Sequence, residues 1–321
     1  MKAIICLEKF SDWLEAYSVF IDNTDLKEVR LIYIENERNN KKAVESLFEE
    51  YKNNISFEYQ GFTDRTLYFK ACRDSLSELS KGDVLAAPFI RYREIWTLVP
   101  EARVKGITTV HLSESFPDSF GRLGYRLGFR LVGGFDIKGF IKQLCIMPFA
   151  YHYANTHKPD ICYYNMYPAV KNEFVRTTKQ AHLPKVNTKK KAFLLDKING
   201  EKRTLLIAGF GYNLQNMVKY LNLNKYIATS KDREIIIDGI RYPLDDYICA
   251  EEVLLSGCVD SIIGYNSTAM CWAYLIGNIK ITCYETKRLS YQYGFLNGYL
   301  TRKTLKKCGI ELLPECKEML D

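Results

Sequence analysis

The stretch VDSIIGYNSTAM, residues 259–270, predicts a buried strand that turns directly into a helix. A small polar turn ends the strand, and the apolar helix predicted for Ala269 to Ile276 follows at once. The first amides of such a helix have no partner within it, and its dipole is positive at that end. These amides, the helix dipole and the hydroxyls of Ser267 and Thr268 together favour binding of a phosphate. The alternative interpretation is that the two residues only cap the helix.

A second unit of the same design lies upstream. Thr204 to Ala208 is typical of a parallel strand, Gly209 and Gly211 of a turn, and Asn213 of the N-cap of a helix over Leu214 to Leu221. Two strand-turn-helix units in one half of the chain indicate a nucleotide site. A Gly-x-Gly without a third glycine, and without an acidic residue at a strand end about 20 residues later, is not a dinucleotide fingerprint. The alternative of an ordinary tight turn therefore stays open.

Strands and helices alternate along both halves. In the first half the predicted strands are 2–7, 29–34, 55–59, 84–88 and 108–112, and the predicted helices are 11–20, 40–53 and 67–79. In the second half, further strands are predicted at 226–229, 234–237 and 280–284, and an acidic helix at 245–255. This alternation predicts an α/β fold with doubly wound, mostly parallel sheets, whose ligands lie beyond the carboxyl ends of the strands.

The length of 321 residues predicts two domains. A stretch rich in Lys, Thr, Asn and Pro, residues 177–203, is predicted to be the linker. The predicted domains are then residues 1–176 and 204–299, and residues 300–321 are expected to form a terminal helix that packs back on the first domain.

The composition narrows the class of protein. No apolar stretch reaches the ~18 residues of a membrane span, and the N-terminus does not have the pattern of a signal peptide, so a cytoplasmic protein is expected. Ten scattered cysteines without a C-x-x-C pair indicate reduced, buried thiols. The four histidines lack ligand spacing and no Asp-x-Asp occurs, so we expect no metal and no cofactor.

The net charge of +7 is unevenly distributed. Arg122, Arg126 and Arg130 recur every four residues and would form one stripe on a helix. The stripe favours contact with an anionic membrane, glycan or nucleotide, and its alternative is a solvated helix face. No nucleic-acid-binding module is recognisable, so nucleic acid is not an expected partner.

Two carboxylates follow the strand predicted at 108–112. Glu114 and Asp118 would lie at the carboxyl end of that strand, where wound sheets place their sites. A carboxylate at this position can act as a general base, and Glu114 is the first candidate. The alternative for both residues is a solvated loop.

These motifs resemble those of the bacterial sialyltransferases of capsule and lipooligosaccharide synthesis, glycosyltransferase families 52 and 38. Glu114 is similar to the base of that family's acidic motif, although Ser113 and Ser115 replace its acid and glycine. Ser267 and Thr268 are similar to its Ser-Ser or Ser-Thr motif. The residues 2–7 and 250–252 also resemble such enzymes, so the likeness extends loosely over most of the chain.

The resemblance implies a GT-B fold, in which two Rossmann-like domains face a cleft. It implies an inverting, metal-independent transfer of sialic acid from CMP-sialic acid to a sugar hydroxyl of a surface glycan, with Glu114 as base and Glu251 on the nucleotide side. The first domain would then bind the acceptor and the second the nucleotide sugar. The family's His-Pro motif has no counterpart, because no histidine follows His182. The nearest residues are Arg241 and Tyr242, which we expect to neutralise and hydrogen-bond the leaving phosphate.

The expected partners are a nucleotide-sugar donor and a lipid-linked glycan acceptor, with peripheral contact at the inner face of the cell membrane. Two alternatives stay open. One is a non-catalytic glycan-binding or assembly protein of the same fold, which the missing histidine favours. The other is a transferase that uses a different nucleotide-linked donor.

Overall fold

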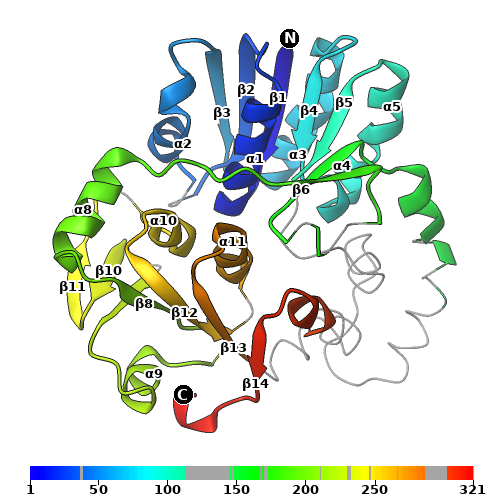
Figure 1. The fold of residues 1–321 in the computed structure, drawn as a ribbon. Helices are drawn as coiled ribbons and strands as arrows, with labels where there is room; N and C mark the ends of the chain where they lie inside the picture. Colours follow the sequence, from blue (N-terminus) through cyan, green and yellow to red (C-terminus); the bar gives the residue numbers. More distant parts are fainter. Residues whose placement is uncertain are drawn as a thin grey trace. The chain divides into compact units, whose positions relative to one another are not determined.

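The computed structural model describes residues 1–36, 39–112, 145, 148–149, 151–166, 168–169, 173–209, 211–229, 233–245, 247–265, 267–285 and 302–320. They belong to two compact units, Met1–Pro184 and Lys185–Asp321 (Figure 1). Each unit is built on one seven-stranded sheet with helices packed against it.

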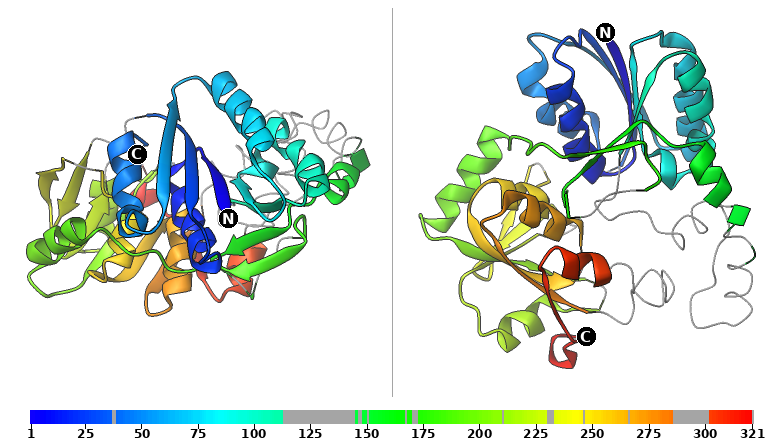
Figure 2. Two further views of the ribbon diagram at one scale, coloured as in Figure 1. Left: turned by 90° about the horizontal axis from the view of Figure 1, so that it is seen from above. Right: turned by 45° about the vertical axis from the view of Figure 1, so that its right-hand side comes forward.

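The first unit has the strand order β3-β2-β1-β4-β5-β6-β7, and every pairing in it is parallel. The strands are β1 (Lys2–Leu7), β2 (Glu28–Ile34), β3 (Ser56–Phe62), β4 (Val84–Ala87), β5 (Thr108–His111), β6 (Ile161–Tyr164) and β7 (Thr177–Gln180). The helices are α1 (Phe10–Asp22), α2 (Lys41–Leu47), α3 (Arg65–Asp74), α4 (Arg93–Trp96) and α5 (Leu98–Val104), and residues 151–156 are also helical. Figure 2 shows helices on both faces of this sheet.

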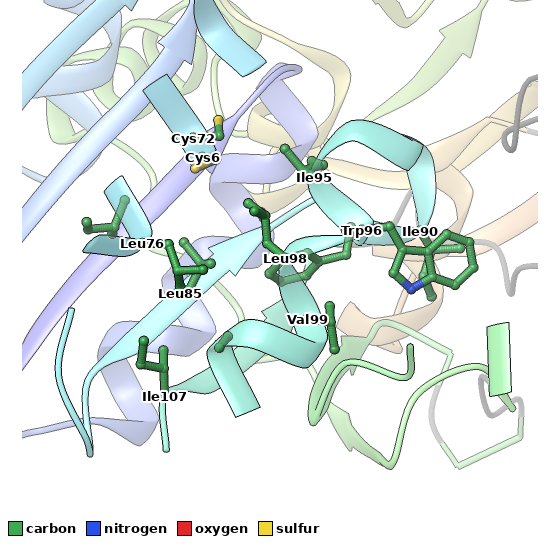
Figure 3. Close-up of a cluster of buried hydrophobic side chains, with 14 of the residues drawn as sticks. Cys6, Cys72, Leu76, Leu85, Ile90, Ile95, Trp96, Leu98, Val99 and Ile107 are labelled. Carbon is green, nitrogen blue, oxygen red and sulfur yellow. The ribbon is translucent and has the colours of Figure 1, made fainter. Parts of the chain in front are cut away.

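Strand β1 is buried on both faces, as its continuous apolar sequence requires. Ile4 and Cys6 belong to the cluster that also contains Tyr68 and Cys72 of α3, and Figure 3 shows the two cysteines side by side. Alternate residues of a strand point to opposite faces, so Ile5 faces the other layer. The same strand therefore anchors both helical layers of the unit.

The second unit has the strand order β11-β10-β9-β8-β12-β13-β14. The strands are β8 (Arg203–Ile207), β9 (Tyr226–Thr229), β10 (Glu234–Ile237), β11 (Ile240–Pro243), β12 (Val259–Tyr265), β13 (Lys280–Tyr284) and β14 (Glu311–Leu313), and the helices are α8 (Thr188–Ile198), α9 (Leu214–Tyr220), α10 (Ala250–Leu255) and α11 (Thr268–Ile276). Strand β10 runs antiparallel to both of its neighbours, β9 and β11, and the other pairings of this sheet are parallel. The predicted α/β class with two doubly wound, Rossmann-like units is confirmed.

The unit boundary differs from the sequence prediction. Residues 177–203, predicted to be a linker, contain strand β7 and helix α8, and the units meet between Pro184 and Lys185. The polar composition of this stretch has a local cause. Asn187 caps α8, with its side chain accepting from the amides of Lys189 and Lys190, and β7 is a largely exposed strand at the edge of its sheet.

Two further elements differ from their predictions. The acidic helix expected at 245–255 begins only at Ala250, because Cys249 occupies its N-cap position. The C-terminal residues, expected to pack on the first domain, belong to the second unit. After a helix over residues 302–307, β14 extends the sheet beside β13, and the carbonyl of Met319 accepts from the Asn213 amide at 2.9 Å.

None of the ten cysteines, all of which lie among the described residues, forms a disulfide, and eight of them are buried, as the sequence predicted for most of them. Among the described residues, the structure contains no helix of the length and apolarity that crossing a membrane requires.

Candidate functional site at the switch point of the second sheet

The two turns that the sequence singled out lie side by side. The chain leaves β8 toward β9 and returns to β12 on the opposite side of β8, so the winding direction reverses between β8 and β12. The two strands are parallel, with Leu206 beside Ile263 and Ile207 beside Gly264, and their carboxyl ends meet at one edge. Ligands of open α/β sheets bind at such a reversal. The β8 and β12 turns therefore form one candidate site.

Close backbone packing holds the two strand ends together. A Cβ at Gly264 would lie 2.7 Å from both Cβ and the carbonyl oxygen of Ile207, so only glycine fits there. The phenol of Tyr265 covers Gly209, where a Cβ would lie 3.2 Å from its oxygen. The glycines thus serve the approach of the two turns to each other.

The first turn is tight, and main-chain hydrogen bonds between Gly209 and Tyr212 close it. Gly209 and Gly211 have φ angles of 139° and 98°, which L side chains rarely adopt. Gly209 and Tyr212 exchange two main-chain hydrogen bonds, both of 3.1 Å. Asn213 accepts from the amides of Gln215 and Asn216 at 2.9 and 3.2 Å, so it is the N-cap of α9, as predicted. These hydrogen bonds show a tight turn followed by a capped helix.

The second turn differs, because neither of its hydroxyls caps α11. Ser267 stands at the N-cap position with extended backbone angles, but its side chain makes no cap hydrogen bond. Its Oγ is buried and has no hydrogen-bond partner within the described part of the chain. The hydroxyl of Thr268 donates instead to Oε1 of Glu251, at 2.8 Å. The N-terminus of α11 therefore presents one unused hydroxyl and, beside it, a carboxylate.

Helix α10 carries Glu251, and the buried contacts of the next residue, Glu252, fix the start of this helix. The next residue, Glu252, is 1% exposed, and its carboxylate accepts from Nζ of Lys190 at 2.9 Å and from the amide of Cys249 at 3.1 Å. Lys190 also donates to the carbonyl of Tyr247 at 2.7 Å. Burial raises the pKa of Glu252, and the Lys190 ammonium opposes that shift.

Sequence reasoning missed the Lys190–Glu252 pair. Its partners lie 62 positions apart, and the local Cys-x-x-Glu capping box, with a cysteine in place of the usual Ser or Thr, signals only the start of α10.

Arg241 and Tyr242 are not brought to the candidate site. They lie on the edge strand β11, four strand spacings from β12, which is about 19 Å at the usual separation. Arg241 pairs with Glu234 at 2.8 Å, and the Tyr242 ring packs edge-on against Phe193.

The predicted catalytic carboxylates Glu114 and Asp118, and the basic stripe Arg122, Arg126 and Arg130, lie outside the described residues. Over the described ranges, no group of three or more His, Cys, Asp or Glu side chains is placed to hold a metal ion.

No protein-family model and no curated protein matches the chain. Three solved structures are similar in part. A UDP-glucosyltransferase from Polygonum tinctorium, capable of glucosylating indoxyl, is 8% identical over 88% of this chain and 79% of its own, with a TM-score of 0.47. The glycosyltransferase VinC, in complex with dTDP, is 10% identical over 100% and 88%, with a TM-score of 0.48. A periplasmic sugar-binding protein of an ABC transporter from Legionella pneumophila is 9% identical over 99% of each chain, with a TM-score of 0.25. All three scores lie below 0.5, so these likenesses decide nothing about activity.

Proposed function

We propose that this chain is a glycosyltransferase of GT-B type that binds a nucleotide-sugar donor at the β8/β12 switch point. The observation that carries the proposal is the Ser267 hydroxyl, buried at the N-terminus of α11 and without a partner among the described residues. A buried hydroxyl without a partner costs free energy, and a phosphate at this helix end would remove that cost. The resemblance of Ser267 and Thr268 to the Ser-Thr motif of sialyltransferases supports the same ligand.

Charge divides the proposed site into two parts. Phosphate binds at Ser267 and the first amides of α11, because hydroxyl and amide donors and the helix dipole all favour an anion. Glu251 repels phosphate, so its carboxylate instead accepts hydrogen bonds from hydroxyls of the ribose. Thr268 orients that carboxylate through its 2.8 Å hydrogen bond. Gly211 allows the first turn to approach the ligand closely, Gly209 lies under Tyr265 and keeps the two turns together, and Asn213 acts through the cap of α9. Arg241 and Tyr242 have no role in this proposal.

The proposed reaction is an inverting displacement of CMP from CMP-sialic acid by a hydroxyl of a bacterial surface glycan. The acceptor oxygen forms a bond to the anomeric carbon while the bond from that carbon to the phosphate oxygen breaks. The acceptor proton passes to the base, for which Glu114 is the candidate, and Asp118 is the second choice. CMP leaves as a stable anion, so charge stabilisation at α11 replaces a general acid, and neither metal nor cofactor takes part.

Two further proposals come from sequence alone. The protein is cytoplasmic, and Arg122, Arg126 and Arg130 hold it at the anionic inner face of the membrane, where a lipid-linked acceptor is found. Vesicle binding that falls as salt rises would support this location.

Calorimetric titration of the full chain with CMP, UDP and dTDP tests the donor site. Binding of CMP above the other two supports a CMP-linked donor, and preference for UDP or dTDP assigns a different one. Binding of none of the three would refute the proposal and favour a non-catalytic glycan-binding or assembly protein. Turnover of CMP-sialic acid with a glycan acceptor then separates an enzyme from a protein that only binds the nucleotide.

A further inference from the structure

The first unit has a switch point of its own, which the nucleotide site does not use. Its chain winds outward from β1 through β2 and β3 and returns to β4 on the other side of β1. Residues that follow β1 and β4 therefore occupy the position where an open sheet of this kind binds its ligand. Glu8 follows β1, and Arg91 and Tyr92 follow β4.

These residues form a buried ionic network. Arg91, which is 5% exposed, donates through Nη2 to Oδ1 of Asp12 at 2.7 Å and through Nη1 to Oε2 of Glu8 at 3.0 Å. Asp12 is fully buried and also accepts from the amides of Glu8 and Lys9. Breaking a buried pair of this kind is strongly destabilising, so Arg91 and Asp12 hold the Glu8 carboxylate in a fixed position.

The outer oxygen of Glu8 has exchangeable contacts. Oε1 accepts from Nη2 of Arg65 at 2.9 Å and from the hydroxyl of Tyr92. Burial and the nearby Glu8 carboxylate raise the pKa of Tyr92, so its hydroxyl remains a donor at neutral pH. The Arg65 side chain is 64% exposed, and an ion pair to so exposed a group contributes little. A ligand hydroxyl can therefore replace Arg65 at small cost.

An acceptor without a partner lies beside Glu8. Asn39, 2% exposed, follows β2 and donates through Nδ2 to the main-chain oxygen of Glu8 at 2.8 Å. Its Oδ1 is buried and has no partner among the residues that the structure describes. Reversing the amide would set two acceptors against each other, so the network supports this orientation. Asn39 Oδ1 therefore requires a donor, and Glu8 Oε1 can accept from a ligand hydroxyl in place of Arg65.

We propose that the switch point of the first unit binds a sugar residue, whose hydroxyls donate to Oε1 of Glu8 and Oδ1 of Asn39. Both groups that would meet the ligand here are acceptors, which disfavour a phosphate, whereas the site at α11 presents donors. Glu8 and Asp12 balance Arg91 and Arg65 in charge, so the site favours a neutral, hydroxyl-rich ligand. The choice of a sugar rests on the proposed function, in which the sugar belongs to the glycan acceptor.

The test is saturation-transfer NMR on the full chain without nucleotide, with methyl galactoside and methyl N-acetylglucosaminide as probes. Asn39→Leu removes the unpaired acceptor and should weaken binding of the responding glycoside at least fivefold. Arg65→Ala removes the competitor for Glu8 and should strengthen it at least threefold. Lys70→Ala, an exposed change on the same helix, is the matched control and should leave binding unchanged.

Absence of transfer to both glycosides at 20 mM would overturn the proposal, and so would equal binding by wild type and a folded Asn39→Leu variant. If the Asn39→Leu variant does not fold, the test is the Arg65→Ala variant. Glycoside binding by Arg65→Ala that is no tighter than binding by Lys70→Ala refutes the site. If the protein binds CMP but neither glycoside, this inference is refuted and the proposed function is not. If it binds a glycoside but no nucleotide, the proposed function is refuted and the sugar site is not.

Discussion

Replacing Ser267 by alanine separates a ligand contact from a helix cap. The Ser267 hydroxyl makes no cap hydrogen bond and is buried without a partner among the described residues, so its removal should not lower the free energy of unfolding and should raise it by at most about 1 to 3 kcal/mol. A hydrogen bond to a charged phosphate is worth about 1.5 to 3 kcal/mol, which corresponds to about a 10- to 150-fold weaker affinity for CMP. Affinity for cytidine, which has no phosphate, should remain the same.

Asn213→Ala is the matched control, because Asn213 does cap its helix through two hydrogen bonds. Loss of that cap should cost about 1 kcal/mol of stability and lower the Tm by about 2 to 4 °C, with a smaller effect on CMP affinity. Calorimetry with CMP and cytidine, together with urea unfolding of each variant, measures both quantities. A Ser267→Ala variant that is less stable but binds CMP as tightly as wild type would refute the reasoning and identify Ser267 as a cap.

Three further predictions concern stability. Lys190→Met leaves the buried Glu252 carboxylate unpaired and should cost about 3 to 5 kcal/mol in urea unfolding, and Glu252→Leu in the same chain should recover part of that loss. Gly264→Ala forces a Cβ against the backbone of β8 and should cost about 1 to 3 kcal/mol, whereas an unchanged urea midpoint would contradict the close approach. Burial opposes ionisation of Asp22, but hydrogen bonds from three neighbouring side chains outweigh it, so the pKa of Asp22 is lower in the folded protein than in the unfolded chain. Asp22 therefore stabilises the fold above its unfolded pKa, and this stabilisation is lost as the pH falls through the folded pKa. Asp22→Asn should therefore flatten the decline in stability below pH 4, measured by urea unfolding across that range.

Local sequence predicted most strands and helices near the site. The β12 turn and α11 were readable because an apolar strand, small polar residues and an apolar helix follow one another within 18 residues. The same holds for the β8 turn, where Asn213 was correctly assigned as a cap. Strands β6, β7, β11 and β14 were not predicted; each has only three or four residues, and β7 and β11 are also largely exposed and have no clear apolar alternation.

The sequence by itself determined the α/β class, the two wound halves and the two turns that follow β8 and β12. Tertiary structure alone decided that these two strands are neighbours, that Arg241 lies at the far edge of the sheet, and that Glu8 meets Arg91 across 83 positions of the chain. Only the fold reveals that Ser267, at the N-cap position of α11, makes no cap hydrogen bond. The physical reason is that periodicity and capping are local properties of the chain, whereas strand order and the pairing of buried polar groups depend on contacts between residues far apart in sequence.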